Sequence, residues 1–207
     1  MLDLQTEQEF FNLGYQYLGG LDEAGRGPLA GPVVAACVVI DSHFKIDQSD
    51  LKLVTDSKKL SASKREQLFK IIKEKVTAVE IGIATNEEID QINILQASFL
   101  AMRRAVKKLK IQPDYLLVDG NFKVPQLNKS QTAIVHGDAQ VFCIAAASII
   151  AKVSRDWLIT ELAKKYPQYE LEKHKGYGTK RHLELIAKYG PSPLHRLSFA
   201  PFRNKKA

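Results

Sequence analysis

The sequence predicts an α/β fold in which a mixed β-sheet carries helices on both faces. Three strand-like segments come early, and helical and strand-like segments alternate after them, which is the order expected for such a sheet. The 207 residues contain no internal repeat, low-complexity tract or long linker, and this length suits one well-packed core. We therefore expect essentially one domain, residues 1–207, with a helical C-terminal part from about residue 170.

The first half of the chain alternates between apolar runs and polar segments. The run from Val33 to Ile40 is nearly continuous, which is typical of a strand buried on both faces. Ser63-Lys64-Arg65-Glu66 fits a capping box and predicts the start of a helix. Alternating apolar residues at Val79, Ile81 and Ile83 predict another strand. We expect strands at residues 17–21, 33–40 and 76–84, a helix at about 63–75, and an irregular segment at 41–60.

The second half contains two short strands and three helical patterns. The strand Tyr115 to Asp119 ends in an acid, and a strand at 132–135 leads into His136-Gly137-Asp138. Small apolar residues after Ala139 suit a helix that packs closely on a sheet. Helices are expected at about 86–110, 139–165 and 179–189, the first with a break near Asn93 as an alternative.

Acidic residues occur where the predicted strands end. Asp22 and Glu23 end the first strand and lead into Gly25-Arg26-Gly27, and Asp119 and Asp138 follow later strands. Neighbouring side chains of a strand point to opposite faces, so Asp22 and Glu23 can share a site only near a strand end or bulge. Strand ends of open α/β sheets gather at one edge. Carboxylates suit a divalent cation, and glycines with an arginine admit a phosphate or sugar. The pattern predicts metal-dependent chemistry on a phosphodiester, for which two ions can activate water and stabilise the leaving oxygen.

The charge distribution indicates a polyanionic partner. The formal net charge is +7. Basic residues gather in four segments, at 52–65, 103–110, 173–181 and 203–206. A basic surface around an acidic centre is what a nuclease needs, because the surface attracts phosphates and the centre binds metal.

The remaining composition predicts a cytoplasmic protein without a membrane segment. No apolar run approaches the roughly 18 residues of a membrane span, and the acidic N-terminus lacks the pattern of a signal peptide. Cys37 and Cys143 lie in apolar stretches without a Cys or His partner at ligand spacing, so we expect two buried core thiols.

Six ordered motifs give the chain a family resemblance that covers about residues 19–203. They are DEAGRGPLAGPV from Asp22, DSKKL from Asp56, VDGN from Val118, GDA from Gly137, AAASIIAKVSRD from Ala145 and HKGYGT from His174. The segment Gly190 to Arg203 also resembles the family's C-terminal part. Together they resemble type 2 ribonuclease H, specifically the bacterial ribonuclease HII family.

The resemblance implies a ribonuclease H-like fold, with a five-stranded mixed sheet flanked by helices and a helical C-terminal part. It also implies hydrolysis of the RNA strand of RNA–DNA hybrids and incision 5′ of single ribonucleotides embedded in duplex DNA, leaving 3′-hydroxyl and 5′-phosphate ends. Carried over to this chain, the catalytic residues and metal ligands are Asp22, Glu23, Asp119 and Asp138. The implied cofactor is Mg²⁺ or Mn²⁺ at a two-metal site.

Substrate recognition is also implied by the resemblance. Gly25-Arg26-Gly27 becomes the loop that senses the ribose 2′-hydroxyl through main-chain groups, and Tyr177 the aromatic residue beside the ribonucleotide junction. Only closely approaching donors and acceptors can read a 2′-hydroxyl, which supports these roles. Lys58 and Lys152 either contact phosphates or are solvated lysines.

Several neighbouring residues have a structural interpretation. His174 and His195 are expected to form structural hydrogen bonds, because Mg²⁺ prefers oxygen ligands. Asp156 is read as an ion-pair partner, although its position rivals that of Asp138 for the fourth ligand. The run Ala145 to Ser148 is expected to serve close packing of a helix on the sheet.

Two other functions stay open from the sequence alone: a non-catalytic module that binds RNA–DNA hybrids, and a two-metal nuclease acting only on DNA. A monomer is expected, because no apolar repeat favours assembly. No N-terminal extension of the ribonuclease HIII type is expected, because only about 18 residues precede the first motif. The basic residues Arg203-Asn204-Lys205-Lys206-Ala207 form no clear clamp-binding peptide, which leaves recruitment by a sliding clamp open.

Overall fold

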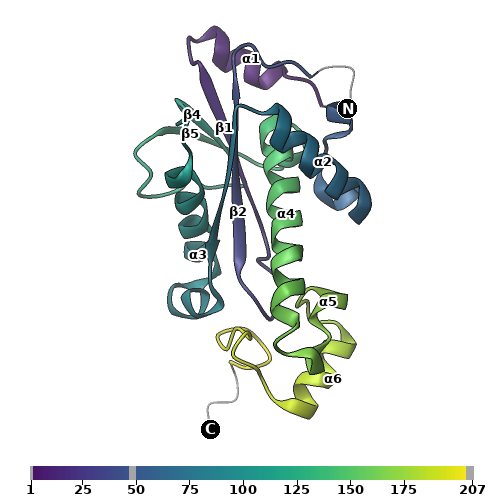
Figure 1. The fold of residues 1–207 in the computed structure, drawn as a ribbon. Helices are drawn as coiled ribbons and strands as arrows, with labels where there is room; N and C mark the ends of the chain where they lie inside the picture. Colours follow the sequence, from purple (N-terminus) through teal and green to yellow (C-terminus); the bar gives the residue numbers. More distant parts are fainter. Residues whose placement is uncertain (1, 47–49, 204–207) are drawn as a thin grey trace.

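The computed structural model describes residues 2–46 and 50–203 (Figure 1). Its strands are β1 (Tyr17–Ala24), β2 (Val33–Asp41), β3 (Ala78–Ala84), β4 (Tyr115–Asp119) and β5 (Ser130–Ile134). Its α-helices are α1 (Gln5–Asn12), α2 (Ala62–Lys75), α3 (Asn86–Lys108), α4 (Phe142–Ala163), α5 (Leu171–His174) and α6 (Lys180–Tyr189). Short 3₁₀ turns occur at Asp50–Leu53, Ser57–Lys59, Gly137–Ala139 and Pro167–Tyr169.

The five strands form one mixed sheet in the order β3-β2-β1-β4-β5. The pairs β1–β2 and β2–β3 are antiparallel, whereas β1–β4 and β4–β5 are parallel. α3 carries the chain from β3 to β4, and residues 120–129 connect β4 to β5 without a helix. The carboxyl ends of β1, β4 and β5 therefore lie at the same edge of the sheet.

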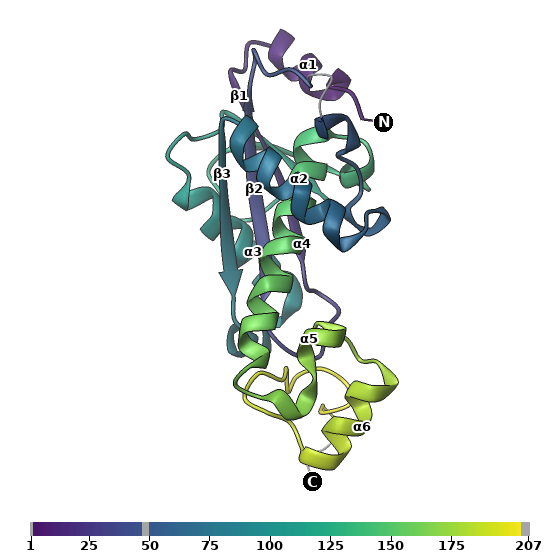
Figure 2. The same ribbon diagram turned by 45° about the vertical axis from the view of Figure 1, so that its right-hand side comes forward.

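Helices cover the two faces of the sheet. α4 packs on β1 and β2 on one face and α3 packs on β2 and β3 on the other, while α2 lies outside α4 (Figures 1 and 2). The buried strand β2 shows both faces: Val38 and Ile40 pack with α4, and Cys37 and Val39 pack with α3. Each such side chain contributes about 1.5–3 kcal/mol when it is fully removed from water.

Helix α4 approaches β1 very closely at Gly20. A Cβ atom built there would lie 2.2 Å from the backbone carbonyl carbon of Cys143. No side chain fits in this space, so glycine is required for the helix to lie directly on the strand. The contact brings the middle of α4, which carries Ser148 and Lys152, to the same end of the sheet as the end of β1.

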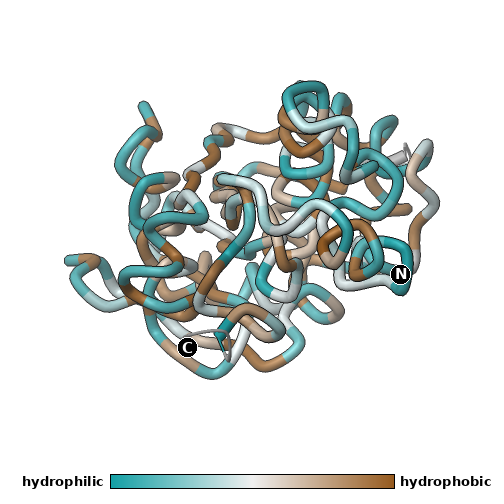
Figure 3. The backbone as a smooth tube through the Cα atoms, turned by 90° about the horizontal axis from the view of Figure 1, so that it is seen from below, coloured by the Kyte–Doolittle hydropathy of each residue, from teal (hydrophilic) through white to brown (hydrophobic). Residues whose placement is uncertain are grey.

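The C-terminal part has a small apolar core, below the sheet in Figure 1, to which Ala30 of the β1–β2 connection also contributes. Ile159 and Ala163 at the end of α4 pack there with Leu171, Leu185 and Ile186. None of the helices in the described ranges is long and apolar enough to cross a membrane. Hydrophobic segments are short and interspersed with hydrophilic ones (Figure 3).

The mixed five-stranded sheet with helices on both faces confirms the expected fold class. The break near Asn93 is also confirmed, since this residue has φ 68° where α3 bends. The capping box at Ser63 is wrong: Ser61 precedes α2 in an extended conformation and its Oγ accepts the N–H of Lys64. α1 was not expected. The one-domain organisation stays a prediction.

Candidate active site

Acidic residues meet at the carboxyl edge of the sheet. β1 and β4 run parallel, with Leu21 opposite Val118, so the acids that follow, Asp22 and Asp119, lie on adjacent strands. β1 extends to Ala24, so Asp22 and Glu23 lie inside the strand, within its last three paired residues. This confirms that the pair occurs near a strand end, where side chains from both faces can reach one cavity.

The fourth acid is connected to the others by a backbone contact. Asp138 lies in the 3₁₀ turn after β5, at Gly137–Ala139. Asp119 Oδ1 accepts the N–H of Gly137 at 2.7 Å and the N–H of Asp138 at 3.4 Å. The carboxylate of Asp119 thus fixes the turn that carries Asp138.

These residues surround a cavity of about 340 Å³. Asp22, Glu23 and Asp119 line it, and Asp138 adjoins it through Lys58. The wall is completed by the following neutral, basic and aromatic residues: Ala24, Gly25, Arg26, Gly27, Ser57, Lys58, Ser148, Lys152 and Tyr177.

A larger hollow of about 1040 Å³ lies between the bend of α3 and residues 197–203. The acid that lines it, Asp90, already accepts the N–H groups of Leu197 and Ser198. The larger hollow is therefore no carboxylate cluster, and the smaller cavity is the candidate active site.

The buried acids repel one another. Burial raises the pKa of Asp22 well above its ordinary value, and the charges of Glu23 and Asp119 add to the rise. Burial also raises the pKa of Glu23, although Arg26, whose Nη1 lies 3.2 Å from Glu23 Oε1, opposes it. The pKa of Asp138 is raised by burial and by Asp119. Ionised carboxylates this close are unfavourable unless a cation compensates them.

The donor set fits a hard divalent cation. All candidate ligands at the strand ends are carboxylate oxygens, which Mg²⁺ and Mn²⁺ prefer over nitrogen or sulfur. Across the described ranges, no three acidic, His or Cys side chains are already arranged as a complete ligand group. Mg²⁺ commonly uses one or two carboxylates together with water and substrate phosphates, so such a partial protein ligand set is compatible with its binding.

The two candidate lysines have different surroundings. Lys58 is largely exposed and its Nζ lies 3.7 Å from Asp138 Oδ2. Partial burial lowers its pKa, but Asp138 and the other nearby acids raise it above the ordinary value. Lys152 Nζ lies 2.8 Å from Asp156 Oδ1 and 5.9 Å from the centre of the Tyr177 ring. The ion pair of Asp156 with Lys152 confirms the structural interpretation of this acid.

The two glycines of the Gly25-Arg26-Gly27 loop have distinct constraints. Gly25 has φ +103°, and a Cβ atom there would lie 2.1 Å from Arg155 Nε. Gly27 has open space, because its Cβ would meet only the Tyr177 ring at 3.7 Å. Glycine is therefore required by the protein itself at position 25, whereas at position 27 the protein leaves room beside an aromatic ring.

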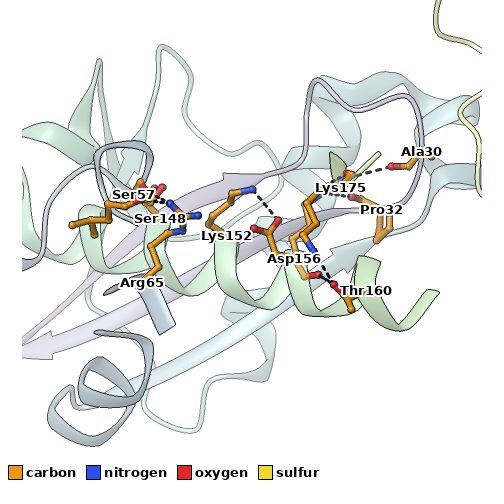
Figure 4. A network of polar contacts seen from close by, with 11 residues as sticks. Ala30, Pro32, Ser57, Arg65, Ser148, Lys152, Asp156, Thr160 and Lys175 are labelled. Atoms are coloured by element: carbon orange, nitrogen blue, oxygen red, sulfur yellow. Dashed lines mark hydrogen bonds and ion pairs between the residues drawn. The ribbon is translucent and has the colours of Figure 1, made fainter. Parts of the chain in front are cut away.

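Two serines at the site were not predicted as functional residues. Ser148 Oγ lies 2.9 Å from Ser57 Oγ, and Ser148 also forms a hydrogen bond with Asp22 that lowers the pKa of this acid. Arg65 Nη1 donates to the carbonyl oxygens of Ser57 and Leu60, which fixes the turn carrying Lys58 (Figure 4). The expected packing role of the run 145–148 holds for its three alanines. The signal in the sequence that could have found Ser148 was a hydroxyl residue directly after three apolar alanines.

The remaining sequence interpretations agree with the structure. His174 Nε2 lies 2.9 Å from the carbonyl oxygen of Tyr169, and His195 Nδ1 lies 2.9 Å from the N of Ser192. Both histidines are thus structural hydrogen bonders. Cys37 and Cys143 are buried free thiols, and burial raises both pKa values.

The fold and the site together define the class of protein. A five-stranded mixed sheet whose adjacent parallel strands β1 and β4 carry acids at their carboxyl ends, beside a basic and glycine-rich wall, is a ribonuclease H-like α/β architecture. Comparisons with known proteins specify it further. A family model described as Ribonuclease HII matches residues 19–202.

Individual relatives agree with the family model. Ribonuclease HII of Endomicrobium trichonymphae is 56% identical over 195 residues, covering 94% of this chain and 90% of that protein. The crystal structure of ribonuclease H2 from Pyrococcus horikoshii OT3 superposes with a TM-score of 0.73 at 30% identity, covering 90% of this chain and 95% of that one. The PCNA:RNase HII complex from Archaeoglobus fulgidus contains a chain with a TM-score of 0.68 at 27% identity, covering 88% and 94%.

The chain therefore belongs to the ribonuclease HII family. It is a metal-dependent endoribonuclease whose activity is that of a ribonuclease H on RNA–DNA hybrids.

Proposed function

We propose that this enzyme uses a two-metal-ion mechanism and that it also incises duplex DNA 5′ of a single embedded ribonucleotide. The observation that carries the proposal is the meeting, in one cavity, of acids from β1 and β4 with the Gly25-Arg26-Gly27 loop and Tyr177. The acids would form the catalytic site, and the loop and the tyrosine ring would form a recognition site for one nucleotide.

Asp22, Glu23, Asp119 and Asp138 would hold the divalent cations, either Mg²⁺ or Mn²⁺. Bound there, two such cations activate water and neutralise charge on the nonbridging and leaving oxygens. In the hydrolysis, the water oxygen bonds to phosphorus and the bond from phosphorus to the 3′ oxygen breaks. The products carry a 3′-hydroxyl and a 5′-phosphate.

The basic side chains would position the substrate backbone. Lys58 and Arg26 lie beside the acids and are largely exposed, so their charges can meet phosphates. Lys152 is held by Asp156 next to the Tyr177 ring, from which it can reach a phosphate on the same side.

Recognition of the ribose would use the open space at Gly27. Main-chain groups of the loop can approach a 2′-hydroxyl there, because Gly27 has no side chain and the space beside it is open up to the Tyr177 ring. Tyr177 is 43% exposed, and its ring can pack on the sugar at the junction.

The first test compares cleavage and binding of an RNA–DNA hybrid by wild-type protein and by Asp22→Asn, Asp119→Asn and Asp138→Asn. Each variant is expected to lose cleavage while hybrid binding, measured by fluorescence anisotropy, stays within a few fold. Asp156→Asn is expected to lose only a few fold, because it frees Lys152 without removing a proposed metal ligand, and Glu161→Gln, at an exposed acid away from the cavity, is the control expected to keep full activity. Full activity of Asp22→Asn or Asp119→Asn would overturn the site assignment. Loss of cleavage in Asp156→Asn, with cleavage retained in Asp138→Asn, would make Asp156 the fourth metal ligand in place of Asp138.

The same assay separates the proposal from its alternatives. Saturable binding without any metal-dependent product would indicate a binding module, and cleavage of an all-DNA duplex would indicate a general DNA nuclease. The monomeric state, the cytoplasmic location and the open question of clamp recruitment stay at the level of sequence predictions.

A further inference from the structure

The two substrate-reading segments are joined through a third segment of the chain. Residues 29–31, which follow the glycine loop, lie between the Tyr177 turn and the segment 192–196. The N–H of Leu29 donates to Gly176 O at 2.8 Å, and the N–H of Arg196 donates to Leu29 O at 2.8 Å. The N–H of Gly31 donates to Leu194 O at 2.8 Å. The loop, the turn and the C-terminal segment therefore form one hydrogen-bonded unit.

Arg196 is a fully buried guanidinium directed at the glycine loop. Its Nη2 donates to Gly25 O at 2.7 Å, its Nη1 to Arg26 O at 2.9 Å and its Nε to Gly31 O at 2.9 Å. The planar group thus fixes three carbonyl oxygens at once, which a lysine cannot do. The guanidinium also lies 5.2 Å from the centre of the Phe199 ring.

Burial of this charge costs free energy that carbonyl contacts offset only in part. Burial, together with repulsion from Arg155, lowers the pKa of Arg196 to about 9, so the group stays charged at neutral pH. Arg155 is the second buried guanidinium, and its donors go to the carbonyl oxygens of Ala30, Pro32 and Lys175. Figure 4 shows the carbonyls of Ala30 and Pro32 at the end of this polar network. Because burying this charge is unfavourable, its contacts with the glycine loop indicate that Arg196 serves to position that loop.

The preceding residue, His195, is directed at the other segment. His195 Nδ1 faces the N–H of Ser192 at 2.9 Å, and its Nε2 lies 3.1 Å from His182 Nε2. His182 Nδ1 lies 2.9 Å from the carbonyl oxygen of Tyr177. With both rings neutral, one proton arrangement satisfies every contact: His195 Nε2–H donates to His182, and His182 Nδ1–H donates to Tyr177 O. Burial lowers the pKa of both histidines, which keeps them neutral.

We propose that His195-Arg196 is a positioning element that fixes the glycine loop and the Tyr177 turn relative to each other, and thereby sets specificity for a single ribonucleotide. The inference rests on the proposed function, because it assigns a support to the two segments that are proposed to read the ribose. Neither residue lines the cavity, so both act through the segments they hold. A displacement of about 1 Å in such a reading site can lower the rate about a hundredfold.

The test measures kcat and KM on two substrates, a long RNA–DNA hybrid and a DNA duplex with one ribonucleotide. The variants are Arg196→Lys, which keeps the charge and loses the planar fork, and Arg196→Gln, which removes the charge that burial disfavours and so provides a variant less prone to unfolding. Leu185→Ala is the control for stability, because it removes apolar contacts from the core of the same C-terminal part and leaves every hydrogen bond of Arg196 in place. All proteins are assayed below their measured unfolding temperatures.

A long hybrid offers a 2′-hydroxyl in many registers, whereas an embedded ribonucleotide offers only one. We expect both Arg196 variants to lose about tenfold more kcat/KM on the embedded ribonucleotide than on the hybrid. Leu185→Ala is expected to lower kcat equally on both substrates, since a smaller folded fraction affects them alike. Equal losses on both substrates in the folded Arg196 variants would overturn the inference. A wild-type protein that cuts the hybrid but never the embedded ribonucleotide would instead refute the proposed function.

Discussion

Replacing Asp22 by asparagine is expected to stabilise the metal-free protein while it abolishes cleavage. Asp22 is 5% exposed, and its charge faces those of Glu23 and Asp119. Asparagine keeps an oxygen that can accept the N–H of Glu23, which Asp22 Oδ1 accepts at 2.6 Å. The substitution thus removes a buried charge and preserves the local hydrogen bond.

The gain in stability from Asp22→Asn is limited, because wild-type Asp22 can bind a proton instead of remaining charged. A raised pKa means that the folded state holds the proton of Asp22 more tightly than the unfolded state does. Asp22 therefore destabilises the protein increasingly as the pH rises above the unfolded value of about 3.9. The gap of about three pH units to pH 7 limits this cost to about 4 kcal/mol, because a larger cost would leave the group protonated. For a chain of this size, we expect Asp22→Asn to raise the unfolding temperature by about 2 to 15 °C.

Thermal unfolding followed by circular dichroism measures the effect between pH 4 and 8, in chelator and in Mg²⁺ or Mn²⁺. In chelator, the difference between Asp22→Asn and wild type should be small near pH 4 and grow with pH. Divalent cation should stabilise wild type more than the variant. Glu161→Gln, which removes an exposed acid paired with Lys164, is the control for net charge and should change little. A variant less stable than wild type in chelator at pH 8 would refute the electrostatic reasoning.

Two further predictions follow from the loop and from the buried histidines. Gly27→Ala should fold with an unchanged unfolding temperature but lose activity on an embedded ribonucleotide, whereas Gly25→Ala should be strongly destabilised because its Cβ would meet Arg155. The unfolding temperature of wild type in Mg²⁺ should fall between pH 6.5 and about 4, because burial and His182 lower the pKa of His195 to about 4 and only the unfolded state takes up the proton in this range. His195→Asn should show a smaller fall over the same range.

Each of the predictions for Gly27, Gly25 and His195 has an outcome that would contradict it. Full turnover of an embedded ribonucleotide by Gly27→Ala would remove the loop from ribose recognition. A stable Gly25→Ala protein would contradict the packing of Arg155 against the loop. An equal fall of the unfolding temperature in wild type and His195→Asn would assign the acid sensitivity to other groups.

The sequence was sufficient for the fold class and for the placement of Asp22 and Asp119 at strand ends. Acids after apolar runs mark strand ends, and parallel strand ends meet at one edge, so the positions of Asp22 and Asp119 followed from local patterns. The start of α2 was misplaced by two residues because Ser61 and Ser63 are both chemically able to cap a helix, and only the backbone conformation distinguishes them.

Other features depend on contacts between distant segments. α1 has a weak apolar pattern and is fixed by buried Glu7, whose carboxylate accepts the N–H of Cys143 at 3.0 Å. Arg155 and Arg196 look like ordinary surface arginines in the sequence, because their carbonyl partners become neighbours only after the C-terminal part folds against the loop. The contacts by which these two arginines hold the loop therefore leave no local signal.

The most direct test of the central claim uses an end-labelled DNA duplex with one ribonucleotide, incubated with Mg²⁺, Mn²⁺ or chelator beside an all-DNA duplex. We expect a cut on the 5′ side of the ribonucleotide that requires metal and is absent from the all-DNA duplex. An uncut ribonucleotide duplex, in a preparation that cleaves a long RNA–DNA hybrid, would contradict the reading of a single ribose by Gly25-Arg26-Gly27 and Tyr177.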